Sequence, residues 1–341
     1  MPRKTSRLEA VATLGIDIGK NTFHLVGLDS KGAIVLRQKL SRGQVDARLA
    51  NMPPCLIGME AHGHDARLMP ARYVRPYSKG QKNDFRDAEA IAEAVLRPTM
   101  KFVAIKTIEQ LDLQALHRVR ERLVCQRTSV INQIRAFLLE RGIAVRPGLR
   151  ALRTEIPIIL AMTDKLSPRM IHVIEALCAD WRHLDARIET VSEEIKTLSE
   201  QDDGAKRLMT VPGIGPIIST ATVAAIGKGD MFSKGRDFGA WLGLVPRQMS
   251  TGGRPILGPI SKRGNRHLRM LFVQAARAVL LRPQSWVKHG LKSWIEAAAR
   301  RLNRFKLAIA LANKIARIVW GVLHGGRNFE VRTLRPALQA A

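Results

Sequence analysis

The strongest constraint on the fold is a long series of apolar residues whose spacing alternates between four and three positions. Such spacing places one apolar stripe along a helix, and a second helix must cover that stripe. The series comprises Met170, Ile174, Leu177, Trp181, Leu184, Ile188, Val191, Ile195 and Leu198. A similar series comprises Leu116, Val119, Leu123, Ile131, Ile134 and Leu138. The two predict long paired helices, either an antiparallel hairpin within the chain or a dimer-forming coiled coil, and the sequence leaves both open.

The first hundred residues have a different pattern. Short β-rich runs separated by two turn sequences predict three adjoining antiparallel strands, at 13–17, 23–28 and 33–36. A helical stretch, two short strands and a second helix are then expected at 45–50, 55–59, 66–69 and 83–96. The sequence therefore predicts an α/β domain over 1–107, a helical coiled-coil region over 108–205 and a mainly α domain over 206–341.

The charge of the chain indicates its class of partner. Lys and Arg number 56 against 29 Asp and Glu, for a formal net charge of +27. This charge is spread along the chain, so we expect a folded binding surface for a polyanion. Nucleic acid fits better than a membrane, because apolar stretches such as Leu307–Ala312 fall far short of the roughly 20 residues of a spanning helix. We expect a cytoplasmic protein, with Cys55, Cys125 and Cys178 as reduced core residues.

Four carboxylates lie at predicted strand and helix ends: Asp17, Glu60, Asp84 and Asp87. Asp17 ends a strand, Glu60 follows an apolar strand, and Asp84 and Asp87 are three apart in the first turn of a helix, so that both can face one ion. Phosphodiester transfer develops charge on oxygen atoms, which Mg²⁺ or Mn²⁺ held by carboxylates stabilises. Turn and helix capping accounts for the same residues without a metal, and that alternative stays open.

Two features of the third region favour contact with phosphates. The turn at 211–216 carries Gly213 and Gly215 and is similar to a helix-hairpin-helix turn, whose backbone N–H groups bind phosphate at the next helix start. Any tight helix connection uses the same residue types. A basic tract follows at 262–269, in which Asn265 is placed to cap a helix. Its cations are assigned to phosphate positioning, with a solvated basic face as the alternative: Lys262, Arg263, Arg266 and Arg269.

Five sequence blocks together resemble one enzyme family. They are Gly15–Lys20, Gly58–Ala61, Lys82–Ala88, Val211–Pro216 and Ser250–Arg269. In this order they are similar to the DEDD transposases of the insertion-sequence "one-ten" type, in the "eleven-eleven" branch, and the similarity runs to about Glu330. It implies a RuvC-like domain with the ribonuclease H fold, a coiled-coil middle and a C-terminal transposase domain.

The resemblance also implies functional residues and partners. Asp17, Glu60, Asp84 and Asp87 would be the catalytic metal ligands, and Ser250 would be the nucleophile that forms a phosphoserine link with DNA. A serine needs activation, to which a nearby cation such as Arg254 could contribute. The family assembles as oligomers around a structured guide RNA, so DNA, RNA and further copies of the chain are the expected partners. Without the resemblance, Ser250 simply opens a Ser-Thr-Gly-Gly turn.

Two other functional classes fit parts of the sequence. The segment Asp17–Lys20 also resembles the first phosphate loop of actin-like ATPases and kinases, but we find no further Gly-rich nucleotide loop in the sequence. A basic helical module that binds nucleic acid without cutting it is the second alternative. Assays for bound ATP and for metal-dependent strand transfer separate these classes from a recombinase.

One departure from the family pattern bears on activity. Relatives place a helix of about a dozen residues after the glutamate strand, where this chain has only Ala61-His62-Gly63-His64 before Asp65. Parallel neighbouring strands need a crossover of about a dozen residues. We therefore expect the 66–69 segment to leave the sheet or to pair antiparallel, or Glu60 to shift away from Asp17. On this hypothesis the copy carries an internal deletion and is catalytically impaired.

Overall fold

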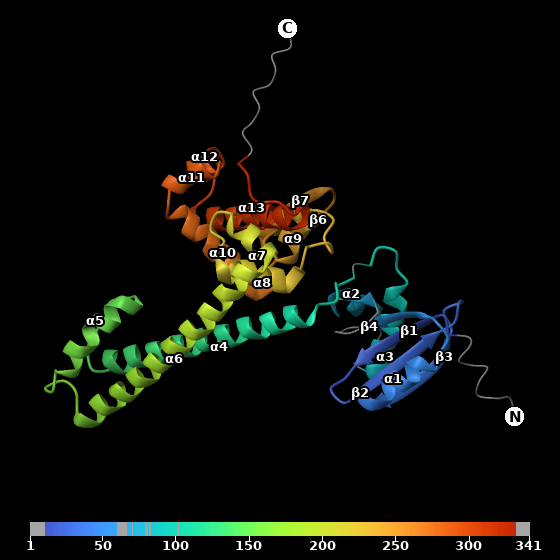
Figure 1. Cartoon of the computed structure of the whole chain (residues 1–341), viewed down its shortest axis with the longest axis horizontal. Helices are drawn as coiled ribbons and strands as arrows, with labels where there is room; N and C mark the ends of the chain where they lie inside the picture. Colours follow the sequence, from blue (N-terminus) through green and yellow to red (C-terminus); the bar gives the residue numbers. More distant parts are fainter. Residues whose placement is uncertain are drawn as a thin grey trace, which may run out of the picture. The chain divides into compact units, whose positions relative to one another are not determined.

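The computed structural model describes residues 11–59, 67–69, 71–78, 81, 83–100 and 102–331. The chain divides into two compact units, Met1–Thr107 and Ile108–Ala341 (Figure 1). The first is a mixed α/β unit and the second is mainly helical. Each unit is described by itself.

The first unit is built on a five-stranded sheet in the order β3-β2-β1-β4-β5. Strands β1 to β3 are antiparallel neighbours, β4 is parallel to β1, and β5 is parallel to β4. The strands are β1 (Thr13–Ile18), β2 (Thr22–Leu28), β3 (Ile34–Ser41), β4 (Leu56–Met59) and β5 (Arg67–Leu68). The β-rich runs and turn sequences therefore predicted the first three strands and their antiparallel order, and the strands expected at 55–59 and 66–69 correspond to β4 and β5.

The expected displacement of the last strand is wrong. Gly58 pairs with Arg67 and Met59 with Leu68 in parallel register, so the segment remains in the sheet and is not antiparallel. The connection is shorter than the usual crossover of about a dozen residues, and the pairing that it allows covers two residues. Because Arg67 pairs with Gly58, the residue before Met59, the chain has to return only one residue, about 3.3 Å, along the strand direction. Glu60 and the rest of 60–66 lie outside the described residues.

Helices cover both faces of the sheet. Helix α1 (Arg42–Ala50) contributes Val45 to a core with Leu14, Ile16 and Leu25. Helix α3 (Asp84–Val95) contributes Ala88 and Ala92 to the core on the opposite face, with Val26 and Leu28. The short α2 (Ala71–Val74) and the 3₁₀ turn Arg75–Tyr77 precede α3.

Helix α3 lies unusually close to β1 at Gly15. A Cβ atom at Gly15 would lie 2.0 Å from the carbonyl oxygen of Ala88 and 2.8 Å from the Cβ of Ala92. Both distances are far below van der Waals contact, so a larger residue at Gly15 would push the helix off the strand. The absence of a side chain at Gly15 therefore sets the position of the first turns of α3.

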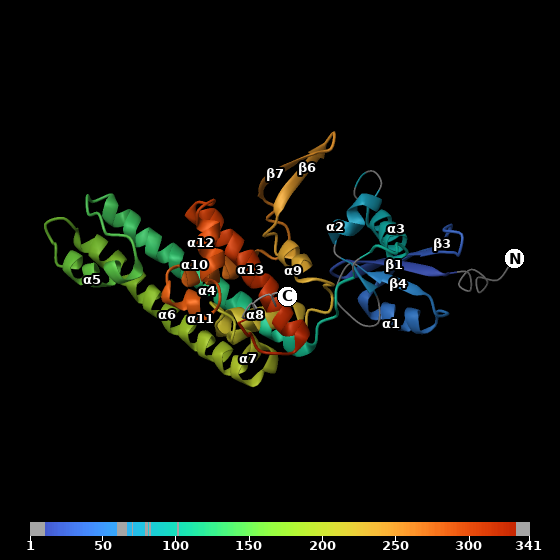
Figure 2. The same cartoon turned by 90° about the horizontal axis from the view of Figure 1, so that it is seen from above.

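The long helices of the second unit pair within the chain. Helix α4 (Ile108–Leu139) and helix α6 (Pro168–Gln201) are joined through α5 (Leu149–Leu160). Arg120 donates to Ser192 Oγ at 2.8 Å, and Arg127 donates to Asp185 at 3.0 Å. Seven residues forward on α4 correspond to seven residues backward on α6, so the helices are antiparallel (Figure 2). The sequence left open an intramolecular hairpin and a dimer-forming coiled coil, and the structure has the hairpin. Coiled-coil supercoiling and dimer formation stay predictions.

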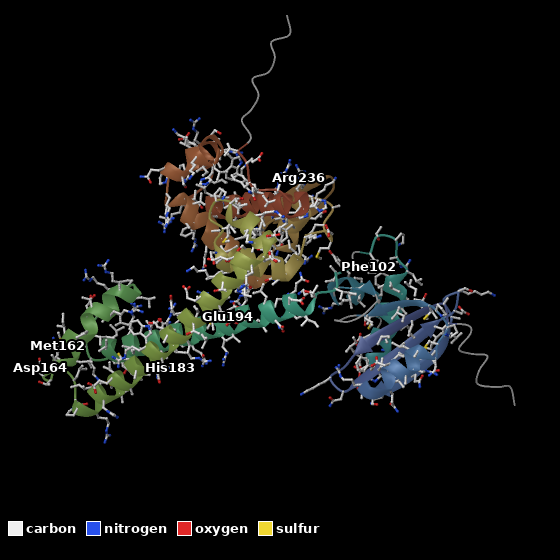
Figure 3. All side chains as sticks on the ribbon, viewed as in Figure 1. Phe102, Met162, Asp164, His183, Glu194 and Arg236 are labelled. Carbon is white, nitrogen blue, oxygen red and sulfur yellow. The ribbon has the colours of Figure 1, made fainter. Side chains whose placement is uncertain are left out.

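The apolar stripe of α6 faces this pairing. Ile174, Trp181 and Ile188 are buried, whereas the exposed residues His183 and Glu194 lie elsewhere on the same helix (Figure 3). Cys178 is buried in the same core and Cys55 is half-buried, and burial raises the pKa of both thiols. Cys125 is exposed on α4, so the prediction of a core position is wrong for it, because it lies off the apolar stripe of that helix.

The rest of the second unit packs around one apolar helix, α13 (Arg304–Gly325). Its buried stripe includes Leu311, Ile315 and Val319. By length and composition α13 could cross a membrane, and it is the single such helix among the described residues. Its buried stripe identifies it as a core helix, and Lys314 and Arg317 interrupt its apolar run. Around it lie α7 (Asp203–Met209), α8 (Pro216–Ile226), α9 (Gly235–Trp241), β6 (Pro246–Thr251), β7 (Arg254–Ile260), α10 (Arg266–Leu280), α11 (Gln284–Lys288) and α12 (Lys292–Ala299).

Polar side chains of α4 attach α8 to the helical hairpin. Gln114 Nε2 donates to the carbonyl of Ala224 at 2.7 Å, in the last turn of α8. The buried imidazole of His117 lies 3.0 Å from Thr220 Oγ1. Because the Thr220 hydroxyl donates its own proton to the Pro216 carbonyl at 2.6 Å, His117 Nε2 must be the donor in the first bond. His117 is therefore held as the neutral tautomer protonated at Nε2.

The environment of His117 opposes protonation. Burial lowers its pKa to about 4, and the nearby charges of His267 and Arg120 act in the same direction. In the unfolded chain an ordinary histidine has a pKa near 6.5. Between these two values the unfolded chain binds a proton that the folded chain does not, so the free energy of unfolding falls as the pH falls from about 6.5 towards 4.

We predict that lowering the pH from about 7.5 to 5 reduces the free energy of unfolding by about 2 kcal/mol through His117. His117→Gln should remove most of this dependence, because a glutamine amide can still donate to Thr220 but does not titrate. The measurement is urea unfolding followed by helical circular dichroism at several pH values, with His183→Gln on the exposed face of α6 as the control. An unchanged pH dependence in His117→Gln would contradict the assignment.

Candidate active site and nucleic-acid interface

Strands β1 and β2 place Asp17 beside a histidine. Asp17 is the direct antiparallel partner of His24, and residues opposite each other in an antiparallel pair project from the same face of the sheet. Two residues before Asp17, Gly15 faces α3, so Asp17 and His24 share the face that this helix covers. Asp17 is half-buried and His24 is 6% exposed.

His24 also contacts the first turn of α3. Its Nδ1 lies 3.6 Å from Asp84 Oδ2, and its ring meets Phe85 edge-on with 4.8 Å between the centroids. His24 therefore lies opposite Asp17 on the neighbouring strand and also contacts Asp84 on α3. Sequence reasoning missed this residue. The sequence did contain a signal for it. The hairpin turn at 19–21 sets the register of the two strands, and in that register His24 lies opposite Asp17.

The two acidic residues of α3 are not the caps of this helix. The side chain of Asn83 accepts from the backbone N–H of Phe85 at 2.9 Å, which is the N-cap interaction. Asp84 contacts His24 and keeps a side chain 57% exposed. Asp87 accepts from Ser78 Oγ at 3.2 Å. The capping alternative therefore does not account for these carboxylates, although both still complement the helix dipole.

The fourth predicted ligand, Glu60, lies outside the described residues. It follows Met59, which ends β4 and pairs with Ile16, the residue before Asp17. Among the described residues no group of three or more His, Cys, Asp or Glu side chains is arranged to hold a metal ion. The described donors of the candidate set, Asp17, Asp84 and Asp87, are carboxylates, the ligand type that suits Mg²⁺ or Mn²⁺.

In the second unit, the turn at 211–216 joins α7 to α8. Gly213 has a φ of +79°, and a Cβ atom there would lie 2.8 Å from the carbonyl oxygen of Ala275 on α10. Packing against α10 is thus sufficient to explain this glycine. Gly215 is the N-cap of α8 with no side-chain cap, and a Cβ atom there would meet nothing within 4 Å. Of the two glycines, Gly215 therefore retains room for a ligand at the helix start.

Ser250 lies on a two-stranded hairpin formed by β6 and β7. The strands are joined by Gly252 and Gly253, whose φ values of +56° and +76° match a two-residue hairpin turn that requires positive φ at both positions. Ser250 is exposed, and its hydroxyl accepts from Gln248 Nε2 at 2.8 Å. Arg254 begins β7 and pairs with Thr251, one residue beyond Ser250. The fold therefore presents the Ser250 hydroxyl on an exposed strand.

The basic tract at 262–269 combines structural and exposed cations. Arg269 is a structural residue, because its Nη1 donates to the carbonyl oxygens of Leu242 at 2.9 Å and Arg263 at 3.3 Å. Burial lowers its pKa, and nearby Arg266 acts in the same direction. Asn265 caps α10, as predicted, by accepting from Leu268 N at 3.0 Å. The side chains left exposed for phosphate contacts are those of Lys262, Arg263 and Arg266.

Comparisons with known proteins identify what the chain is similar to. A family profile described as "Transposase IS116/IS110/IS902 family" matches residues 205–291, and a DEDD transposase profile matches residues 67–142. The transposase for insertion sequence element IS1328 of Yersinia enterocolitica is 40% identical over 94% of this chain and 98% of that protein. The transposase for IS1111A of Coxiella burnetii is 36% identical over 94% and 92%. A probable family 20 transposase of Pseudomonas aeruginosa is 40% identical over 92% and 97%.

Proposed function

The chain belongs to the IS116/IS110/IS902 family of transposases, and on that premise we propose that it cuts and rejoins DNA strands with a metal-binding carboxylate site and a serine nucleophile. The DEDD domain of the family implies a ribonuclease-H-like fold, and the first unit is a mixed α/β unit. The observation that supports the carboxylate site best is the contact of His24 with Asp84, on the face that also carries Asp17.

The proposed roles follow from the chemistry of the side chains. Asp17, Glu60, Asp84 and Asp87 would supply the oxygen ligands, and a bound Mg²⁺ or Mn²⁺ would stabilise the charge that develops on the phosphate oxygens. His24 would hold the Asp84 side chain on the Asp17 side of α3. Ser250 would attack a DNA phosphorus, form a phosphate ester and displace a sugar oxygen that takes up a proton. Attack by a sugar hydroxyl on that ester would rejoin the strand and release Ser250.

The partners belong to the same proposal. DNA is the substrate of a transposase, and the net charge of +27 supports binding of a further polyanion such as a structured guide RNA. Assembly as a homo-oligomer through the α4–α6 hairpin is supported by exposed apolar side chains on α4, such as Leu111 at 38% and Val119 at 36%. A cytoplasmic location stays a prediction. A non-catalytic nucleic-acid-binding role is the second candidate, and the cleavage assays below separate the two.

We also propose that this copy has lost a segment after Glu60. The alignment with the IS1328 protein spans 332 positions, and the aligned 94% of this chain is about 321 residues. At about eleven aligned positions, therefore, the IS1328 protein has a residue and this chain has none. The same comparison with the IS1111A protein gives about fifteen such positions. The DEDD profile match starts at residue 67, directly after the 60–66 segment. The alignment lengths support the absence of about one short helix from this chain, and the start of the profile match supports a place for it before residue 67.

The first prediction concerns this loss. Insertion of a helix of about a dozen residues after Ala61 should raise strand-transfer activity, because it restores the length of a usual crossover between parallel strands. The measurement is joining of labelled donor and target DNA in Mg²⁺ by the native chain and by the insertion variant. A flexible Gly-Ser insert of the same length is the control for length alone. Equal and full activity of the native chain would show the segment to be dispensable.

The second prediction concerns the carboxylates. Asp17→Asn and Glu60→Gln should each reduce strand cleavage at least about a hundredfold, the scale expected for loss of one preorganised electrostatic group. DNA binding should change little, because each substitution removes ligand charge and keeps side-chain volume. Cleavage and binding are measured on the same DNA. The substitutions are made in the native chain or in the insertion variant, whichever of the two is active. Asp46→Asn on the exposed face of α1 is the control, and normal turnover by Asp17→Asn would end the metal-site proposal.

The third prediction concerns the nucleophile. Ser250→Ala should abolish the covalent protein–DNA adduct that remains after denaturation of a reaction mixture, whereas Thr251→Ala should retain it. Both side chains are exposed on the same hairpin strand, so the pair differs in the position of the hydroxyl and little in its effect on folding. The adduct is measured as labelled DNA that migrates with the denatured protein. An adduct of normal yield in Ser250→Ala would place the nucleophile elsewhere.

A further inference from the structure

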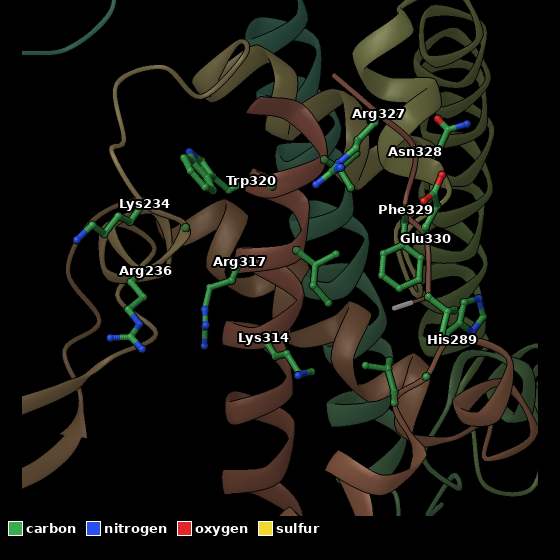
Figure 4. Close-up of a pocket in the computed structure, with 17 residues that line it drawn as sticks. Lys234, Arg236, His289, Lys314, Arg317, Trp320, Arg327, Asn328, Phe329 and Glu330 are labelled. Carbon is green, nitrogen blue, oxygen red and sulfur yellow. The ribbon is translucent and has the colours of Figure 1, made fainter. Parts of the chain in front are cut away.

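Two neighbouring cavities in the second unit share three cations. One has a volume of about 840 Å³ and the other of about 900 Å³, and Arg236, Lys314 and Arg317 line both. Figure 4 shows Lys314 and Arg317 projecting from α13, with Lys234 and Arg236 to one side and Arg327 to the other. The shared side chains make the two cavities one continuous surface, which we call the α13 groove.

The charges of the α13 groove are unbalanced. Its first cavity is lined by Lys234, Arg236, Lys314, Arg317 and Arg327, against the single carboxylate of Glu330. Within the described part of the chain, none of these five cations forms an ion pair. The carboxylate of Asp237, next to Arg236 in sequence, accepts from Ser233 Oγ at 2.8 Å. The groove therefore has an excess of positive charge that its own residues do not neutralise.

Folding brings two of these cations together at an energetic cost. Lys314 and Arg317 are three residues apart on α13, where like charges on one helical face repel each other. Burial lowers the pKa of Lys314, and the nearby charge of Arg317 adds to this effect. The Lys314 ammonium lies 4.9 Å from the centre of the Trp294 ring. A cleft lined by charges of one sign raises the local concentration of oppositely charged ligands, so the groove favours an anion.

The second cavity adds flat apolar surfaces to these charges. It is lined by Trp294 and Phe305, together with Pro246, Pro259 and Ile260 from the ends of the β6–β7 hairpin. Phe305 is 58% exposed, and the guanidinium of Arg304 lies over its ring, 4.8 Å from the ring centre. Aromatic side chains beside basic ones form the surface on which proteins bind unpaired nucleic acid, because bases stack on the rings while the cations neutralise phosphates.

We propose that the α13 groove binds an unpaired nucleic-acid strand, with phosphates at Arg236, Lys314 and Arg317 and a base against Trp294 or Phe305. A duplex fits this surface less well, because its bases are already stacked and are not free to contact the rings. The inference rests on the nucleic-acid partners of the proposed function and gives one of them a site, but it does not depend on the roles of Asp17 or Ser250. RNA and single-stranded DNA share the recognised chemistry, and separate probes distinguish them.

The test measures binding by fluorescence anisotropy. The probes are labelled oligo(U), oligo(dT) and a DNA duplex, each of about a dozen nucleotides or base pairs, which is within the size of known single-strand sites. The variant is Arg236→Glu/Arg317→Glu, and the matched control is Arg182→Glu/Arg187→Glu, with the same change in net charge on the exposed face of α6. Thermal melting of each variant checks folding. If charge reversal unfolds the protein, Arg236→Gln/Arg317→Gln carries the same expectation.

The groove variant should lose affinity for an unpaired strand at least about tenfold more than the control, and its slope of log affinity against log salt should decrease by about two. Trp294→Leu/Phe305→Leu, which removes both rings, should weaken binding of the unpaired strands at least about tenfold and leave duplex binding unchanged. A stronger effect on oligo(U) than on oligo(dT) would assign RNA, and the reverse would assign DNA. Equal losses in the groove and control variants, or no effect of Trp294→Leu/Phe305→Leu on unpaired strands, would overturn the proposal. Because the test measures binding alone, it fails independently of the cleavage predictions.

Discussion

The approach of α3 to β1 at Gly15 determines where the candidate catalytic side chains lie. A Cβ at this position would overlap the backbone of Ala88, so the helix axis is fixed by main-chain contact and not by adaptable side chains. The first turn of α3 consequently brings Asp84 to His24, the cross-strand partner of Asp17. A carboxylate site must keep its groups within a fraction of an ångström, and a backbone contact of this kind limits sliding of the helix.

The sequence predicted much of the fold, and for identifiable reasons. The short β-rich runs in residues 13–36 and the two turn sequences between them predicted β1 to β3, and the heptad spacing after Met170 predicted α6. Both signals arise from neighbouring residues that share one face of an element. The pairing of α4 with α6 inside the chain needed the structure, because an apolar stripe does not specify which helix covers it. Displacement and antiparallel pairing of β5, two of the three expected outcomes of its short link, were wrong, because the crossover rule was applied without knowing how short the strand is; the third, a shift of Glu60, lies outside the described residues.

The site was predicted less completely. Asp84 and Asp87 could be identified from their place at a helix start, whereas His24 becomes informative only when the register of β1 and β2 is known. Arg269 looked like one more cation of a basic tract, yet its guanidinium binds two backbone carbonyls. The α13 groove was not visible in the sequence, because its cations come from 234–236, 314–317 and 327, segments that only folding brings together.

The β6–β7 hairpin has a consequence for the order of events on this protein. Its strands are exposed along nearly their whole length, and side chains such as Met249 at 68% and Leu257 at 65% exposure lack an apolar layer to pack against. A two-stranded ribbon without such a layer is only marginally stable by itself. A surface that binds the hairpin must offset the conformational entropy that its residues lose, which is about 1 to 2 kcal/mol for each residue that becomes fixed. Ser250, the proposed nucleophile, would then reach a defined position only after docking, so assembly would precede the presentation of its hydroxyl to DNA.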